Sequence, residues 1–460
     1  MSPRAWQCRV AAGLLVAGLL GGCVVGNDYT RPALDLPEKF RFENPEAHDV
    51  ANTKWWEQFE DPALNELIDS ALANNLDVRI AAARVEEFYG ALGVTRSGFY
   101  PQVGADFAAT RELIPPSTSA SDRFQADVFA AWELDVFGRL RRLTEASRAD
   151  LLASEEGRHF AVLSLIGAVA SGYIALRTLD SQVDIARRTL KSRADALTIF
   201  EARHRRGGIS ELELSQQRSE YASALATIPR LEQQQLQTEN ALAVLIGRNP
   251  GPIARAKTIE ELALPSVPAG LPSELLERRP DVRQAEANLA SAIEQIGVAR
   301  GAQFPALTLT GSFGAQSSDL DRIFSGGSRV WGIGAGLLGP ILDGGRYAAR
   351  TQQAEARAKQ AEAIYQRSVE NAFRDVADAL SNVRLAAETE NDLAIEVEQA
   401  RTALRLSTER YRTGYSGYIE VLDAQRTLNV AQLLFIRNRQ AYLSFTVDLM
   451  NALGGGWKPS

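Results

Sequence analysis

The sequence predicts a membrane-associated α+β protein, built as an internal duplication, whose single chain is incomplete without further copies. Three observations lead to this fold class. Two segments of 68 residues each, 139–206 and 346–413, contain no proline and predict very long helices. Four segments of about ten residues alternate between apolar and small or polar side chains, as tilted membrane strands do. Landmarks of the first half return 207 residues later in the second half.

The bulk composition of the 460 residues excludes several classes of protein. Lys and Arg number 50 against 57 Asp and Glu, a net charge of −7, so a nucleic-acid binder that neutralises phosphates is not expected. The three histidines (His48, His159 and His204) are far apart, and both cysteines (Cys8 and Cys23) lie within the first 23 residues. These side chains offer no zinc site, thiol enzyme or disulfide framework. The glycine pattern Gly334–Gly339 matches a dinucleotide fingerprint, but Pro340 follows it and its glycines lie on a predicted strand. Since no Gly-x-Ser-x-Gly, Walker or metal-helix motif occurs either, the sequence predicts no enzyme activity, no metal and no cofactor.

The N-terminus predicts a lipoprotein export signal. Arg4 and Arg9 precede an apolar run of eleven residues, 10–20, which is too short to span a membrane as a helix. The run ends in Leu20-Gly21-Gly22-Cys23, which resembles a bacterial lipobox. The resemblance implies removal of the preceding residues, lipidation of Cys23 and delivery to the outer membrane, since the next residue is not the aspartate that favours inner-membrane retention. The alternative is an ordinary signal peptide with an incidental cysteine.

The two long segments carry the residues of stable helices. The second is rich in Ala, Glu, Gln, Arg and Leu and contains no glycine, whereas Gly157, Gly167 and Gly172 interrupt the first. A continuous helix of this length would extend about 100 Å. Charges recur along both segments, so neither is predicted to span a membrane. In the second, small or apolar residues recur at spacings of four and three, which predicts coiled-coil-like packing: Leu393, Val397, Ala400, Leu404 and Ser407. The alternative is an exposed filament or scaffold helix.

Both halves of the chain follow one plan. The ends of the long helices match, Arg203-His204-Arg205-Arg206-Gly207 against Arg410-Tyr411-Arg412-Thr413-Gly414, and a second helical stretch follows each. Two halves of this length predict one pseudo-symmetric domain rather than a solenoid. The predicted boundaries are a signal peptide at 1–22, an N-terminal equatorial segment at 23–62, a first repeat at 63–247 with a hairpin at 101–135, an equatorial linker at 248–279, a second repeat at 280–453 with a hairpin at 305–342, and a tail at 454–460.

The hairpins between the helices predict membrane strands. Each segment has one apolar face, expected to contact lipid, and one face of small or polar residues. The apolar faces comprise Val103, Ala105, Phe107 and Ala109; Phe124, Ala126, Val128, Ala130, Trp132 and Leu134; Leu307, Leu309, Gly311 and Phe313; and Trp331, Ile333, Ala335 and Leu337. The alternative is a pair of soluble hairpins on a helical body.

Four strands cannot close a barrel by themselves. Their two edges would leave N–H and C=O groups unpaired in lipid, at several kcal/mol each. The smallest closed barrels have about eight strands, so the chain must oligomerise to form a pore. Two, three or four copies would each suffice, and strand arithmetic does not choose among them.

Motifs spread from about residue 20 to 455 resemble those of the TolC-like outer-membrane channel family, in its acylated, OprM- and NodT-like branch. The motifs are the lipobox with Tyr29-Thr30-Arg31-Pro32, Trp55-Trp56 with Phe59 and Asp61-Pro62, Arg278-Arg279-Pro280-Asp281-Val282, Leu342-Asp343-Gly344-Gly345-Arg346, Tyr411-Arg412-Thr413-Gly414 and Leu422-Asp423-Ala424-Gln425-Arg426. The resemblance implies a homotrimer, with a twelve-stranded outer-membrane β-barrel to which each chain gives four strands. A long α-helical periplasmic barrel and a mixed equatorial domain would continue it.

The resemblance also implies a role and partners. The trimer would be the passive exit duct of a tripartite efflux pump, lipid-anchored in the outer membrane and extending into the periplasm. It would carry drugs or other small molecules, together with a periplasmic adaptor protein and an inner-membrane transporter of the RND type. The alternatives are a non-channel periplasmic scaffold lipoprotein, or a channel for a different export system such as type I secretion.

In this family a gate lies at the periplasmic tip. Carried over, Asp423 and Arg426 are gate residues with Tyr411 as a partner, and positions i and i+3 share one face of a helix. The alternative is an ordinary solvated ion pair. The 207-residue offset places Gln216 and Ser219 at the matching positions of the first repeat, so the gate is expected to be asymmetric. The turn residues are candidate adaptor contacts, with helix capping by glycine as the alternative: Arg206, Gly207, Thr413 and Gly414.

Overall fold

The computed structural model describes residues 25–26, 28–32, 54–113, 115–116, 118–265 and 275–455. The predicted signal peptide and Cys23 lie outside the described residues. The chain forms two compact units. The first unit holds the described residues within 1–34, 83–156 and 283–368, and the second those within 35–82, 157–282 and 369–460. The predicted boundaries follow the sequence repeats, whereas each compact unit draws on both repeats.

The predicted duplication is confirmed by three pairs of helices of equal length. The long helices α4 (Arg139–Arg205) and α8 (Arg346–Arg412) both have 67 residues. The helices that follow them, α5 (Glu211–Leu245) and α9 (Tyr418–Ala452), both have 35, and those before the strands, α3 (Leu76–Ser97) and α7 (Pro280–Gly301), both have 22. The other helical elements of the described residues are η1 (Trp55–Phe59), α2 (Pro62–Asn74), α6 (Leu275–Arg278) and η3 (Leu320–Arg322).

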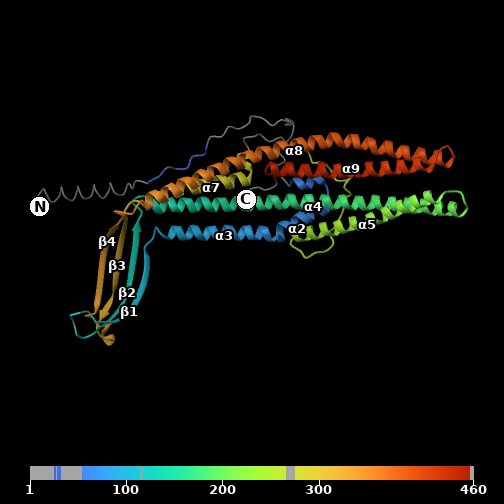
Figure 1. The fold of residues 1–460 in the computed structure, drawn as a ribbon. Helices are drawn as coiled ribbons and strands as arrows, with labels where there is room; N and C mark the ends of the chain where they lie inside the picture. The colour runs from blue at the N-terminus through green and yellow to red at the C-terminus, as the bar shows by residue number, and fades with distance from the viewer. Residues whose placement is uncertain are drawn as a thin grey trace. The chain divides into compact units, whose positions relative to one another are not determined.

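The first unit contains one antiparallel sheet of four strands in the order β1-β2-β3-β4 (Figure 1). The strands are β1 (Gln102–Glu112), β2 (Ser121–Leu134), β3 (Ala306–Ser317) and β4 (Arg329–Leu338). In this sheet β1 and β4 are edge strands with one neighbour each. The prediction of four strands per chain is therefore confirmed, and the sheet is open at both sides.

The register of the sheet confirms the predicted apolar face. Residues that pair directly across antiparallel strands lie on the same face. Phe107 pairs with Ala126, Val128 with Phe313, and Phe313 in turn with Trp331. Trp331 is 74% exposed in the single chain. The opposite face carries Asp106 paired with Asp127, and Thr308, Thr310 and Ser312 of β3.

One glycine is required where β2 and β3 approach each other. A Cβ atom on Gly314 would lie 2.3 Å from the carbonyl oxygen of Ala126 and 2.5 Å from Cβ of Asp127. We expect Gly314→Ala to destabilise the folded protein by about 1–3 kcal/mol, because the added atom overpacks the pairing. Gly336→Ala is the matched control, since a Cβ on Gly336 meets no atom within 4 Å. Thermal unfolding in detergent measures both, and equal midpoints would contradict this account of the pairing.

The second unit contains a large hydrophobic core and a smaller buried cluster between α8 and α9. Within it α4 pairs with α5, and α8 with α9, as antiparallel helices (Figure 1). Trp55 packs edge-on against Trp56 and Phe59, with ring centroids 5.8 and 6.2 Å apart, and all three rings are buried. The core combines η1, one face of α2, the middle of α4, the end of α5, residues 253–262 and α9.

Part of α4 is more apolar than expected. An 18-residue window of this helix has at most two charged residues and is apolar enough to cross a membrane, although half of the window is buried inside the chain. The same helix supplies the core with Leu165, Ile166, Val169, Tyr173 and Ile174. Packing in the second unit therefore accounts for this apolar stretch.

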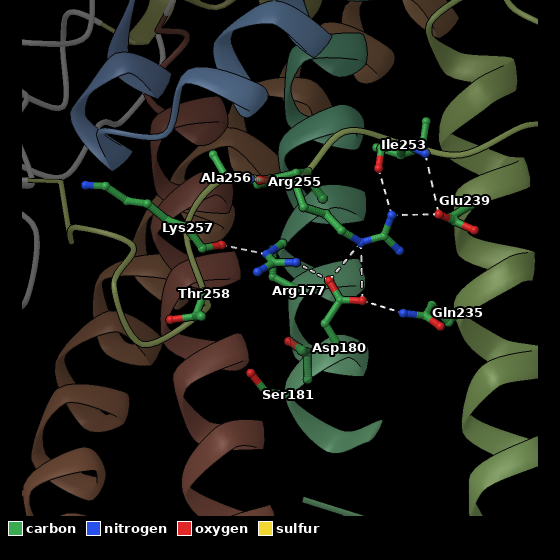
Figure 2. Close-up of polar contacts among 12 residues, drawn as sticks. Arg177, Asp180, Ser181, Gln235, Glu239, Ile253, Arg255, Ala256, Lys257 and Thr258 are labelled. Atoms are coloured by element: carbon green, nitrogen blue, oxygen red, sulfur yellow. Dashed lines mark hydrogen bonds and ion pairs between the residues drawn. The ribbon is translucent and has the colours of Figure 1, made fainter. Parts of the chain in front are cut away.

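The linker after α5 is fixed by a network of charges (Figure 2). Arg255 lies between two carboxylates, with Nε 3.0 Å from Oδ2 of Asp180 and Nη1 2.7 Å from Oε1 of Glu239. Arg177 pairs with Asp180 and donates from Nε to the carbonyl oxygen of Lys257 at 2.6 Å. Residues of α4 and α5 thus hold the linker that joins the two repeats.

Candidate functional site

The predicted gate and contact residues all lie in the second unit, at the ends of α4 and α8 and near the starts of α5 and α9. Both long helices end in the same way. Gly207 and Gly414 have φ of 72° and 80°. The N–H of Gly208 donates to Arg203 O, and the N–H of Tyr415 to Arg410 O, both at 2.9 Å. These bonds form the Schellman ending that favours glycine, so the capping role of the two turn glycines is observed directly.

Tyr411 packs against residues of α4 and α9. Its hydroxyl accepts a hydrogen bond from Arg203, whose guanidinium carbon lies 5.3 Å from the ring centroid. Its ring meets Tyr418 edge-on at 5.1 Å, and Tyr418 lies 4.6 Å from the ring of Phe200. Burial raises the pKa of Tyr418 above its ordinary value. Tyr411 therefore joins the end of α8 to the end of α4 rather than to Asp423 or Arg426.

Arg426 is held by a carboxylate of another helix. It forms an ion pair with Glu220 of α5, and Glu220 also lies 3.5 Å from Nη2 of Arg193 of α4. Arg193 is 95% buried and donates from Nη1 to Oε1 of Gln425 at 2.6 Å. We call Arg193, Glu220, Gln425 and Arg426 the three-helix latch, because they join α4, α5 and α9. Three of its members line a cavity of about 190 Å³ between those helices.

Asp423 stands apart from these contacts. Its side chain is exposed, and within the described part of the chain it forms no ion pair with Arg426. The local i, i+3 bridge that the motif allows is not formed, because Glu220 of α5 is the carboxylate that Arg426 reaches. The structure thus brings Arg426 and Tyr411 into two separate contact groups and leaves Asp423 facing solvent.

Sequence reasoning missed Glu220 and Arg193. The repeat offers no signal for Glu220, since position 427, at the 207-residue offset, is threonine. Both residues act through contacts between helices that are distant in sequence. Among the described residues no group of three or more His, Cys, Asp or Glu side chains is arranged to hold a metal ion.

An open four-stranded sheet with one apolar face, carried by helices of 67 residues, defines a class of protein: the outer-membrane channels with the TolC-like fold. The chain belongs to the outer membrane efflux protein family, whose model matches residues 67–248 and 271–455.

Relatives cover nearly the whole chain. The solvent efflux pump outer membrane protein SrpC of Pseudomonas putida is 34% identical over 96% of this chain and 97% of its own length. The cation efflux system protein CusC of Escherichia coli is 33% identical over 96% of this chain and 98% of its own. The solved MtrE outer membrane channel of Neisseria gonorrhoeae matches with a TM-score of 0.86 and 30% identity, covering 94% of this chain and 98% of that one.

Proposed function

We propose that this chain is the outer-membrane exit duct of a tripartite efflux system and that three copies form the duct. The observation that carries the proposal is the open sheet, with its continuous apolar face and two unpaired edges. Such edges are costly in lipid, and closure by further copies removes them. The paired Asp106 and Asp127 lie on the other face, which we expect to face the water-filled interior, because carboxylates are disfavoured in contact with hydrocarbon.

The proposed duct is passive and has partners on the inner side. A periplasmic adaptor and an inner-membrane transporter, of the RND type, would supply the cargo and the energy, and the duct itself would catalyse no reaction. The names of the relatives indicate different cargo, solvent for SrpC and cations for CusC. The cargo is therefore expected to depend on the transporter rather than on a pocket of this chain.

Ion conductance after reconstitution in planar bilayers tests the duct. We expect stable conducting events from the assembled protein. A protein that never conducts, in wild-type form or with its gate residues replaced, would instead support the periplasmic scaffold. Loss of the protein without a change in drug or dye accumulation would point to another cargo, such as a type I secretion substrate.

We propose in addition that Cys23 carries a lipid anchor. The support is the Leu20-Gly21-Gly22-Cys23 motif and the absence of any other cysteine after the signal peptide. Mass spectrometry of the purified protein should show a mature chain that begins with an acylated Cys23. A mature N-terminus without an acyl group would exclude the anchor.

For the turns we propose adaptor contact through Arg206 and Thr413, beside the capping glycines Gly207 and Gly414. The side chain of Arg206 is exposed. Because backbone bonds satisfy the turn, this side chain is not needed for the cap. Arg206→Ala should therefore weaken adaptor binding in a pull-down without changing thermal stability. Unchanged binding would leave the turns with the capping role alone.

The proposed gate comprises Asp423, Arg426 and Tyr411. Since Asp423 is exposed and faces no partner among the described residues, we propose that it acts next to its own copies in the trimer. We expect Asp423→Ala to raise conductance by up to roughly fivefold, the effect of an exposed charge worth about 1 kcal/mol. Single-channel recording measures this, and an unchanged conductance would remove Asp423 from the gate.

A further inference from the structure

A short segment after the proposed lipid anchor is clamped by one buried arginine of the first unit. Arg142 of α4 is 5% exposed and uses all three of its nitrogens. Nε donates to Val25 O at 3.3 Å, and Nη2 donates to Gly26 O at 3.0 Å. Nη1 lies 2.9 Å from a carboxylate oxygen of Asp28 and 2.9 Å from one of Glu294 on α7. Glu294 balances the buried charge, and the segment fills the remaining donor directions of the guanidinium.

Two glycines allow the segment to pack closely against α7. Gly26 has φ of 112°, and a Cβ atom added there would lie 3.0 Å from Cα of Gly297 on α7. A Cβ on Gly297 would in turn lie 2.8 Å from Cγ of Arg142. Backbone thus packs directly on backbone at this point. Neither glycine belongs to a turn of the fold's regular elements, so the close approach itself is the reason for glycine at both positions.

The segment continues along α7 and is fixed again at its far end. Arg31 forms a two-bonded ion pair with Glu286, at 2.7 and 2.8 Å, and the Tyr29 hydroxyl donates to the same carboxylate at 3.0 Å. The described residues of the segment are therefore held at both ends, by Arg142 at Val25 and Gly26 and by Glu286 of α7 at Tyr29 and Arg31.

The clamp lies at the level where the sheet ends. The N–H of Val25 donates to the carbonyl oxygen of Phe137 at 3.3 Å. Phe137 follows the last residue of β2 by three positions and precedes α4 by two. Only one residue separates Val25 from Cys23, and two peptide units reach at most about 7 Å. A lipid on Cys23 would thus enter the membrane close to the point where β2 leaves it.

We propose that Arg142 is the positioning residue of the lipid anchor. It fixes the first residues of the mature chain so that the acyl chains and the sheet meet the same membrane surface at one height. This inference rests on the proposed lipidation of Cys23. An anchor on a loose tether would only retain the chain at the membrane, whereas a clamped anchor also sets the depth at which the strands insert.

Proteolysis of the intact outer-membrane protein tests the clamp. Asp28 is the first aspartate after the cysteine, so endoproteinase Asp-N releases the lipopeptide 23–27 when the segment opens. We expect Arg142→Gln to release this peptide at least ~10-fold faster than wild type, since cleavage follows local opening. Arg148→Gln is the matched control, because Arg148 lies on the same helix and, among the described residues, pairs with the exposed Glu145 alone. Equal rates for wild type and Arg142→Gln would overturn the clamp.

A second variant covers the case in which Arg142→Gln fails to fold because Glu294 is left unpaired. Gly26→Val disturbs the segment and keeps the Arg142–Glu294 pair, and it should accelerate release in the same way. Mass spectrometry of the released peptide reports separately whether Cys23 is acylated. Failure of the lipid proposal and failure of the clamp are therefore distinct results.

Assembly kinetics test the positioning role. The rate at which newly exported chains reach the heat-resistant outer-membrane form is followed by pulse-chase, for the lipidated protein and for a form exported with a non-lipoprotein signal peptide. We expect Arg142→Gln to slow assembly several-fold in the lipidated form only. If Arg142 acts by positioning the lipid, the effect of the substitution depends on whether the lipid is present, so the two changes are not additive. Equal slowing in both forms would reduce Arg142 to a structural residue and overturn the proposal.

Discussion

Asp61→Ala is expected to remove a large share of the stability of the second unit. Asp61 is fully buried and begins α2, where its carboxylate accepts from the N–H groups of Ala63 and Leu64. The same carboxylate accepts from the Tyr173 hydroxyl at 2.9 Å and from the N–H of Lys257 at 3.1 Å. Loss of the cap costs about 1 kcal/mol, and each buried donor left without an acceptor costs about 1–3 kcal/mol.

The total for Asp61→Ala is about 3 kcal/mol or more, a large share of the roughly 5–15 kcal/mol that holds a domain folded. Thermal unfolding and the yield of folded protein measure it. Asp69→Ala is the matched control on the same helix. Asp69 is exposed, and its one ion pair among the described residues, to Lys54, is long at 3.8 Å and exposed as well. Asp61→Asn should recover part of the loss, because the amide oxygen can still cap α2. A midpoint for Asp61→Ala equal to that of Asp69→Ala would contradict this role.

Glu220→Gln is expected to loosen the three-helix latch and shift the proposed gate toward its open state. The substitution keeps the size of the side chain and removes the charge that holds Arg426 and the buried Arg193. If these contacts stabilise the closed state and are weakened by about 1–3 kcal/mol, the equilibrium constant between the closed and open states shifts roughly 5–150-fold. The measured quantity is the open probability of single channels in planar bilayers.

Glu232→Gln provides the control for the latch. Glu232 lies on the same helix and pairs with Arg187 of α4 at 2.9 Å, but both side chains are exposed and the pair joins α5 to α4 only. We expect this variant to conduct as wild type does. If Glu220→Gln leaves the open probability at the wild-type value, the latch holds helices together without any part in gating.

The fold was predictable because its signals are periodic and local. Alternation with a period of two places Phe107, Val128 and Trp331 on one face without knowledge of their neighbours, and the register agrees. The absence of proline and the strength of the helix formers predicted the long helices, and the 207-residue offset predicted their pairing in two repeats. The division into compact units was not predictable in this way, because it depends on packing between elements of different repeats.

The candidate site was predictable only in part, since its contacts are distant in sequence. Asp61 before Pro62 is a local signal for a helix start, yet its partners Tyr173 and Lys257 lie 112 and 196 residues away. Arg426 was predicted from a motif, but its partner Glu220 is 206 residues earlier. Arg142 and Gly26 carry no local pattern at all, and their roles follow only from the contacts that the fold creates.

The central claim is that one chain supplies an open part of the barrel wall, and that identical copies close the barrel. The mass of the detergent-extracted protein, measured by light scattering with the detergent contribution subtracted, tests it most directly. We expect three times the mass of the mature chain, and no smaller species under conditions that preserve the fold. A stable, water-soluble single chain, with the sheet folded and both edge strands β1 and β4 unpaired, would contradict the claim.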